Sequence, residues 1–443
     1  MSNAVDVQLA AFGVAQVIVI LKEIPTPAAA VKMSAALAAA TPVAAARSAK
    51  SVQTVVMELA KHFRFSERGP DTALALEATS RNEKSVGASW FKKAKSAANP
   101  TPAARYFPNL GVMFGTVDKA GLDHLQANDR VANVTAPPVM SLIRPVAAAA
   151  VKPAKQFTWG IKRLKADRLH KAGVTGAGVI VGHLDTGADG THPALKKAFH
   201  AFAEFDDFGF QVSPDPAPHD SAEHGTHTAG TIAGRTATGH AIGMAPEALL
   251  ASAMVIESGN ATARILAGMD WIIGQGARIL SMSLGFRGFT EDFLALTQLL
   301  RTKGVLPVFA VGNEGAGFSR SPGNYAEALS VGAMGPDETV AEFSCSQQFA
   351  RPDNPLVPDV VAPGVGVVSA KPTGGYQKMD GTSMATPHIA GLAALLMGAE
   401  PSKTIDEIEQ AIFDSCTPLA GEPQDRQNRG VPDAVKALEL LQE

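Results

Sequence analysis

The chain has 443 residues, enough for two or three domains, and 46% of them are hydrophobic whereas only 18% are charged. This composition is typical of a folded protein with a sizeable core and excludes an intrinsically disordered chain. Because 39 basic residues stand against 42 acidic ones, the charge does not indicate a nucleic acid or an anionic membrane as partner. A protein or peptide partner is the better expectation.

The first apolar stretch, Leu9–Leu21, does not have the flanks of a secretory leader. Asp6 precedes it, no Lys or Arg does, and no small-residue cleavage site follows. Met1–Ala4 is compatible with the replacement of a removed leader, so a cytoplasmic and an exported location both stay open. No window reaches the run of about 18 apolar residues that a membrane-spanning helix requires.

Residues 1–137 are predicted to form a small α+β domain. The expected elements are strands at Val14–Leu21, Gly111–Val117 and Val131–Val134 and helices at Ser51–Phe63 and Lys119–Asn128. Between them, Pro25–Ala49 is rich in Ala and Pro and is expected to be loosely ordered.

Residues 138–156 are predicted to be a linker, because Ala147–Ala150, Pro153 and Lys155 form a stretch without periodicity, where proteolytic nicks concentrate. From 157 to 443, apolar runs of strand length alternate with helical patterns. Near-continuous Val, Ile and Leu strands that alternate with helices predict an α/β fold, in which a parallel sheet has helices on both faces and forms the middle of three layers.

Three polar motifs interrupt these apolar runs. Asp185 follows the strand-like run Val179–Leu184, at the kind of strand end where functional residues gather, although taken singly it is as well explained as a turn or helix cap. His224 opens a His-Gly-Thr-His sequence. With His227 it has the spacing of two metal ligands, but no third ligand follows at a zinc spacing. Ser383 precedes an Ala-rich helix, either as an N-cap or where the helix dipole favours developing negative charge.

Together, Asp-Thr-Gly, His-Gly-Thr-His and Gly-Thr-Ser-Met-Ala-Thr-Pro resemble, in this order, the pattern of the subtilisin (subtilase) family over about Trp159–Leu441. The resemblance implies a serine endopeptidase with Ser383 as nucleophile, His224 as general base and then acid, and Asp185 as the carboxylate that orients the imidazole. An esterase is a poorer match, because its Gly-x-Ser-x-Gly elbow and its Ser, Asp, His order are missing. The strand that ends in Asn-Glu-Gly implies that the Asn313 amide joins the Ser383 backbone N–H in an oxyanion hole.

The same resemblance implies a groove for extended substrates. Ser283, Leu284 and Gly285 match the strand that pairs with the substrate backbone, and Gly312 lies across the primary pocket. Arg320 stands at the pocket floor, where the family often has a small residue. We expect it either to shorten the pocket or to favour an acidic residue before the scissile bond, unless its guanidinium points to solvent.

No cofactor is expected. The family's calcium loop after the catalytic His looks absent, because Gly234–His240 contains no carboxylate. Elsewhere, four carboxylates have two alternative interpretations: they form weak calcium sites, or they belong to a solvated acidic loop. These residues are Asp206, Asp207, Asp215 and Asp220. Two cysteines, Cys345 and Cys416, either form one bridge or stay as small buried hydrophobic residues.

The N-terminal region weakly resembles the inhibitory propeptide of subtilases, through Val17–Lys22, Leu110–Gly115 and Val131–Val134, with an insertion at about 25–107. This likeness implies an autoinhibited zymogen whose own N-terminal domain is the inhibitor and helps a slowly folding parallel sheet to form. The processing site is expected near Leu142 or Ile143, with Val139–Ile143 in the substrate groove. The alternative is a non-catalytic or permanently inhibited scaffold with the same fold.

Overall fold

The computed structural model describes residues 4–22, 54–64, 104–151, 156–237, 239–256, 261–352 and 354–443. The chain divides into two compact units, Met1–Pro138 and Val139–Glu443. The predicted segment Pro25–Ala49 lies outside the described residues, as does Thr238 in the loop that was compared with a calcium site.

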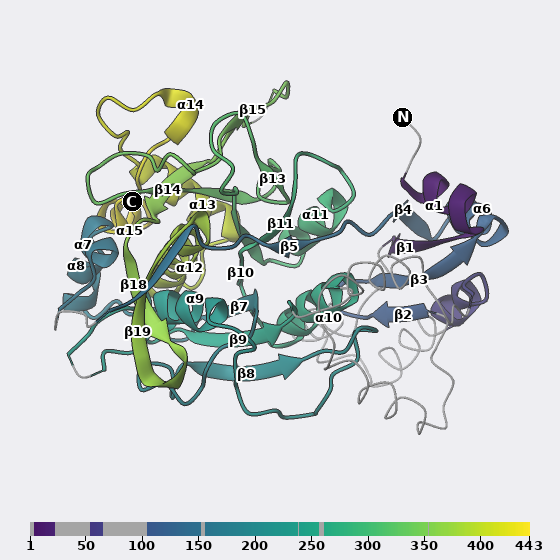
Figure 1. Ribbon diagram of the computed structural model, residues 1–443, viewed down its shortest axis with the longest axis horizontal. Coiled ribbons are helices and arrows are strands. Elements are labelled where there is room, and N and C mark those ends of the chain that lie inside the picture. Colours follow the sequence, from purple (N-terminus) through teal and green to yellow (C-terminus); the bar gives the residue numbers. More distant parts are fainter. Residues whose placement is uncertain are drawn as a thin grey trace. The chain divides into compact units, whose positions relative to one another are not determined.

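The first unit is an antiparallel sheet with helices. Its strands have the order β2-β3-β1-β4 (Figure 1). The elements are α1 (Ala4–Phe12), β1 (Val14–Leu21), β2 (Ala104–Phe107), β3 (Val112–Asp118), α6 (Lys119–Ala127) and β4 (Val131–Thr135), and residues 54–60 are also helical. Asp118 caps α6 by accepting a hydrogen bond from the Gly121 backbone N–H at 2.8 Å. The described elements therefore agree with the predicted α+β arrangement.

The second unit is built on a seven-stranded parallel sheet with the strand order β17-β14-β12-β10-β7-β9-β8. Its strands are β7 (Ile180–Asp185), β8 (Phe199–Glu204), β9 (Leu249–Met254), β10 (Ile279–Met282), β12 (Leu306–Ala310), β14 (Leu329–Met334) and β17 (Val360–Pro363). Most of their residues are buried, as expected of parallel strands that are covered on both faces.

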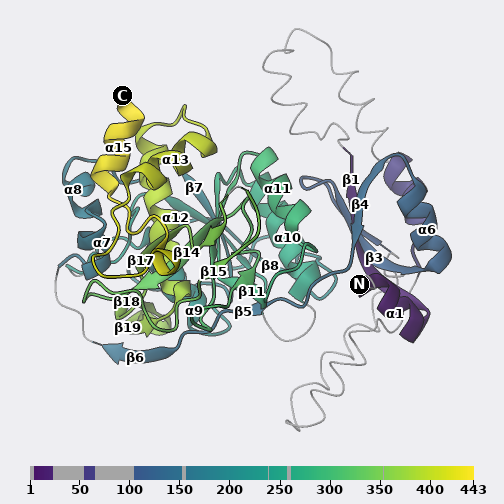
Figure 2. The same ribbon diagram turned by 90° about the horizontal axis from the view of Figure 1, so that it is seen from above.

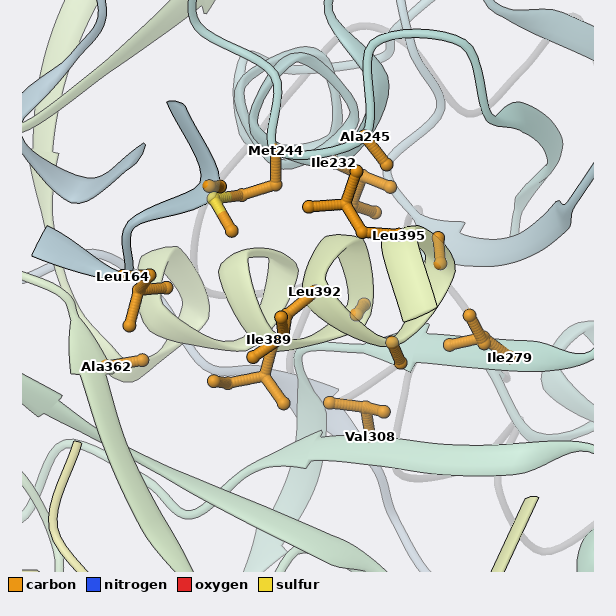
Figure 3. Close-up of a cluster of buried hydrophobic side chains, with 14 of the residues drawn as sticks. Leu164, Ile232, Met244, Ala245, Ile279, Val308, Ala362, Ile389, Leu392 and Leu395 are labelled. Carbon is orange, nitrogen blue, oxygen red and sulfur yellow. The ribbon is translucent and has the colours of Figure 1, made fainter. Parts of the chain in front are cut away.

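Helices form the outer two layers of this unit. On one face lie α9 (His224–Ala233) and α12 (Thr382–Ala399), and on the other lie α10 (Ala261–Gly274) and α11 (Leu294–Thr302) (Figure 2). Figure 3 shows α12 surrounded by buried side chains of its neighbours, with Ile389 and Leu392 in a cluster that includes Ile232 of α9 and Val308 of β12. The predicted three-layer α/β fold is confirmed.

Smaller elements complete the second unit. They are α7 (Trp159–Arg163), α8 (Ala166–Lys171), β11 (Leu284–Arg287), β13 (Arg320–Ser321), β15 (Gln347–Gln348), β16 (Leu356–Val357), β18 (Val367–Lys371), η1 (Pro372–Gly374), β19 (Gly375–Asp380), α13 (Ile405–Ser415), α14 (Gln424–Gln427) and α15 (Ala434–Gln442) (Figure 1). Within the part of the chain that the structure describes, no helix has both the length and the apolar character needed to cross a bilayer.

Two short strands lie where the sequence suggested a linker. β5 (Ser141–Leu142) pairs with β11, and β6 (Ala147–Val151) pairs with β19, both antiparallel (Figure 2). Alanine has little intrinsic preference for strands, and four of the five β6 residues are exposed. This strand therefore depends on the partner edge of β19, which no periodicity in its own sequence could reveal.

Candidate active site

The candidate site lies at the point where the strand order of the parallel sheet reverses. β7 comes first along the chain but lies between β9 and β10, and in such sheets ligands bind beyond the carboxyl ends of the strands around this point. Asp185 is the last residue of β7, Ser283 directly follows β10, and Asn313 lies three residues after β12. The predicted residues are therefore gathered at one edge of the sheet.

Asp185 and His224 are joined by close hydrogen bonds. The Nδ1 atom of His224, at the first turn of α9, lies 2.7 and 2.9 Å from the two carboxylate oxygens of Asp185. The carboxylate also accepts from the Thr186 backbone N–H at 2.7 Å and from the Thr228 hydroxyl at 3.1 Å. Burial, the largest single influence, would raise the pKa of Asp185, but the interactions with His224, His183 and the Thr186 backbone N–H together hold that pKa below its ordinary value. Asp185 therefore stays ionised and fixes the imidazole.

Ser383 lies in the first turn of α12, where a proline changes the local hydrogen bonding. Pro387 has no N–H to donate to the carbonyl of residue i−4, which is Ser383. The hydroxyl of Ser283 donates to this carbonyl instead, at 3.4 Å. This contact ties the start of α12 to the end of β10 and helps to fix the backbone of Ser383.

A segment of the same unit, Val139–Val146, occupies the space in front of Ser383, and we call it the groove segment. The Ser383 hydroxyl donates to the Ile143 carbonyl at 2.5 Å. The Nε2 atom of His224 is buried and, among the described residues, has no hydrogen-bond partner. The hydroxyl is therefore directed at the groove segment and not at the imidazole.

Asn313 is oriented by the residue before Ser383. Its side-chain Oδ1 accepts from the backbone N–H of Thr382 at 2.9 Å and from the Thr382 hydroxyl at 2.8 Å. Because the oxygen is thus engaged, the amide nitrogen must point the other way. Nδ2 donates to the Arg144 carbonyl of the groove segment at 2.9 Å. The side chain is therefore held with a donor directed into the groove.

The expected substrate strand pairs with the groove segment. Leu284 lies opposite Leu142 and Gly285 opposite Ser141 in an antiparallel pair, and the Ile143 N–H donates to the Ser283 carbonyl at 3.0 Å. The backbone of the groove segment thus runs alongside β11 up to Ser383. This is strand addition, a common way of binding extended peptides.

Arg320 neither points to solvent nor carries a free charge. Its side chain is 11% exposed, and its Nε lies 2.9 and 3.1 Å from the Glu314 carboxylate oxygens, with a further contact from Nη2. Burial would raise the pKa of Glu314, but Arg320, together with hydrogen bonds from Cys345 and the Asn313 backbone N–H, lowers it. A Cβ on Gly312 would lie 2.8 Å from the Glu314 carboxylate and 3.0 Å from Arg320 Cγ, so the ion pair packs directly against Gly312.

The remaining expectations concern metals and cysteines. Among the described residues, no group of three His, Cys, Asp or Glu side chains is placed to hold a metal ion. His227 is a buried structural histidine whose Nε2 lies 3.0 Å from the Val367 carbonyl, and burial lowers its pKa to about 3. Cys345 and Cys416 are both free thiols, so the bridge is the alternative that the structure rules out.

The sequence did not identify every residue that shapes the site. Asp220, first considered as part of a solvated loop, accepts from the Thr186 hydroxyl at 2.7 Å and from the Thr226 backbone N–H at 2.7 Å. It therefore ties the Asp185 turn to the first turn of α9. Glu314 was missed because its partner became apparent only in the fold, whereas His183, a polar residue inside the apolar β7, was a visible signal without an assigned role.

Comparisons with known proteins show what the second unit is similar to. The model of the subtilase family, Peptidase_S8, matches residues 176–433. Over 268 residues, the chain is 37% identical to Subtilisin Savinase of Lederbergia lenta and to M-protease of Shouchella clausii strain KSM-K16, covering 60% of this chain and 93% and 66% of those proteins. It is 33% identical to Subtilisin E of Bacillus subtilis strain 168 over 272 residues, 60% of this chain and 68% of that protein.

Proposed function

This chain belongs to the subtilase family and is a serine endopeptidase, and on this premise we propose that its catalytic triad is Asp185, His224 and Ser383. The observation that carries the proposal is the pair of hydrogen bonds, 2.7 and 2.9 Å long, between His224 Nδ1 and the buried carboxylate of Asp185. With Nδ1 engaged, Nε2 is the nitrogen that is left to take the proton of a serine hydroxyl.

In this mechanism, Ser383 Oγ attacks the carbonyl carbon of the scissile peptide bond while His224 Nε2 removes the hydroxyl proton. Asp185 stabilises the imidazolium that results, and the imidazolium then protonates the departing amine. The tetrahedral oxyanion is bound by Asn313 Nδ2 and the Ser383 backbone N–H. The hydrogen bonds from Thr382 support this role, because they hold the Asn313 amide in the required orientation before substrate arrives.

The enzyme is made as an autoinhibited zymogen whose groove segment acts as inhibitor and first substrate, with the scissile bond between Ile143 and Arg144. The Ser383 hydroxyl contact to the Ile143 carbonyl supports this position. Ser383 and Asn313 bind neighbouring carbonyls, of Ile143 and Arg144, whereas catalysis requires both to address the same one. The segment is therefore bound in an inhibitory arrangement, and the Ile143 carbonyl must move into the oxyanion hole before cleavage.

The test compares the full wild-type chain with Ser383→Ala, incubated separately after purification. Wild type is expected to be cut after Ile143, as read by mass spectrometry, and to react with a fluorophosphonate probe only once it is cut. Ser383→Ala is expected to stay intact. The matched control is Ser369→Ala, which removes the hydroxyl of a buried serine on β18 outside the site and is expected to be processed normally.

Processing of purified Ser383→Ala would assign the cut to another protease and refute self-cleavage. Failure of wild type to react with the probe, both before and after limited proteolysis, would support the scaffold alternative over a triad.

A further inference from the structure

Behind the Asp185–His224 pair lies a second buried histidine, which the reaction described above does not use. His183 is two residues before Asp185 on β7, so the two side chains lie on the same face of the strand. Its side chain is 1% exposed. Nδ1 lies 2.9 Å from the Ser252 hydroxyl of β9, and Nε2 lies 2.8 Å from the Thr228 hydroxyl of α9.

The hydrogen bonds around Thr228 have one arrangement that satisfies the carboxylate. Thr228 has a single hydroxyl proton, and Asp185 Oδ2 lies 3.1 Å from the hydroxyl oxygen. If His183 carried its proton on Nδ1, Thr228 would have to donate to Nε2 and would have none left for Asp185. With the proton on Nε2, Ser252 donates to His183, His183 donates to Thr228, and Thr228 donates to Asp185.

Electrostatics favour this second arrangement, because every donor then points toward the buried negative charge of Asp185 and such chains strengthen one another in a low dielectric. The titratable groups that face His183 are Asp185, Asp220 and His224. Burial lowers the pKa of His183 despite the two carboxylates, so the imidazole is neutral, with one donor and one acceptor nitrogen.

We propose that His183 and Thr228 are positioning residues that orient the Asp185 carboxylate and thereby set the basicity of His224. The inference rests on the proposed triad. Without His183, the Thr228 hydroxyl turns to its other acceptors, the carbonyls of Gly225 at 3.1 Å and His224 at 3.2 Å. When Thr228 is replaced, the hydroxyl itself is lost. Asp185 then loses a donor, its charge is less dispersed, and His224 holds its proton more tightly.

The test uses the activated enzyme and three variants. Thr228→Val keeps the side-chain shape and removes the hydroxyl, His183→Val removes the imidazole that donates to this hydroxyl, and His183→Gln restores both a donor and an acceptor. For the two Val variants we expect kcat to fall about tenfold with KM little changed, as for loss of one hydrogen bond to a charged group. The acid limb of the kcat/KM profile is expected to move to higher pH. His183→Gln is expected to recover most of the wild-type kcat and most of the wild-type position of the acid limb.

The control for lost stability is His192→Gln. His192 is also fully buried, and its Nε2 lies 2.8 Å from the Gly375 carbonyl, away from Asp185. It is expected to lower the melting temperature without moving the pH limb. If His183→Val and Thr228→Val fold and keep the wild-type kcat and the acid limb of the kcat/KM profile, the positioning role of His183 and Thr228 is refuted while the triad stands. If wild type itself cleaves no peptide after activation, the proposed function fails instead.

Discussion

Neutralising Glu314 is expected to change the side chain that the primary pocket prefers. In the wild type, Glu314 satisfies the guanidinium of Arg320, whose Nη1 also lies 3.2 Å from the Ser141 hydroxyl of the groove segment. Glu314→Gln keeps the volume of the side chain and removes its charge. The cation that remains is 11% exposed and lies beside Ser141, and by the family resemblance it is proposed to line the primary pocket.

The magnitude follows from the burial of the pair. Removing one partner of a buried ion pair typically lowers the free energy of unfolding by about 3–5 kcal/mol. We expect the lower end, because Gln still accepts one hydrogen bond and the Glu314 side chain is 18% exposed. A substrate carboxylate that pairs with Arg320 recovers about 1.5–3 kcal/mol, the usual worth of a hydrogen bond to a charged group. This range corresponds to roughly a tenfold to 150-fold gain in relative kcat/KM.

The assay measures kcat/KM for two fluorogenic peptides that differ only in having Leu or Glu before the scissile bond. Wild type is expected to favour Leu, and Glu314→Gln is expected to shift the Glu-to-Leu ratio upward by at least about tenfold. Glu342→Gln, an exposed carboxylate nearby, is the control and leaves the ratio unchanged. A ratio that changes less than about twofold in Glu314→Gln would refute the reasoning, and a wild type that already prefers Glu would show that Arg320 is available despite its partner.

Three further predictions concern the oxyanion hole, a buried carboxylate and strand β6. Asn313→Leu is expected to lower kcat about a hundred- to a thousandfold with a small change in KM, a magnitude that comes from a subtilisin itself, and steady-state kinetics of the activated enzyme will check it. Burial raises the pKa of Asp359 to about 6, above its unfolded value, so its ionisation opposes folding increasingly as the pH rises from about 4 through about 6. Urea unfolding is therefore expected to show that Asp359→Asn changes the free energy of unfolding more favourably at pH 7.5 than at pH 4, by roughly 2 kcal/mol, and an effect that is equal at both pH values would contradict the shift. In β6, replacing both Ala148 and Ala149 by Pro must remove an N–H that faces β19, because N–H groups alternate along a strand. Hydrogen exchange of the remaining β6 amides is expected to be slow before and after the cut at Ile143 in wild type and fast in this variant.

The fold, and the three residues that we propose as the triad, stood out in the sequence for the same physical reason. Parallel strands that are covered on both faces are continuously apolar, so Asp185 stood out as a carboxylate at the end of an apolar run. The two other motifs combine small residues with His224 and Ser383 at helix starts, which is a local signal. Positions that depend on such local patterns are visible without a structure.

Interactions between distant segments were not predictable in this way. Arg320 had three open alternatives although its partner, Glu314, is only six residues away, because the two side chains meet across a loop that has no regular periodicity. The Ala147–Ala150 run suggested a linker because alanine carries no strand signal, and its strand character comes from the edge of β19. His183 broke an apolar run, but Ser252 and Thr228, which give it a role, are 69 and 45 residues away.

How the groove segment is held bears on how the enzyme would activate. Its hydrogen bonds with the site use the backbone carbonyls of Ile143 and Arg144, the Ile143 N–H and the short β5 pairing, and the Ser141 hydroxyl adds contacts to Gly285 and Arg320. Backbone pairing of this kind accepts many sequences. The β6 pairing continues on the other side of Ile143, so a single cut leaves both new ends bound. Activation is therefore expected to be limited by dissociation of the two ends and not by the first cleavage.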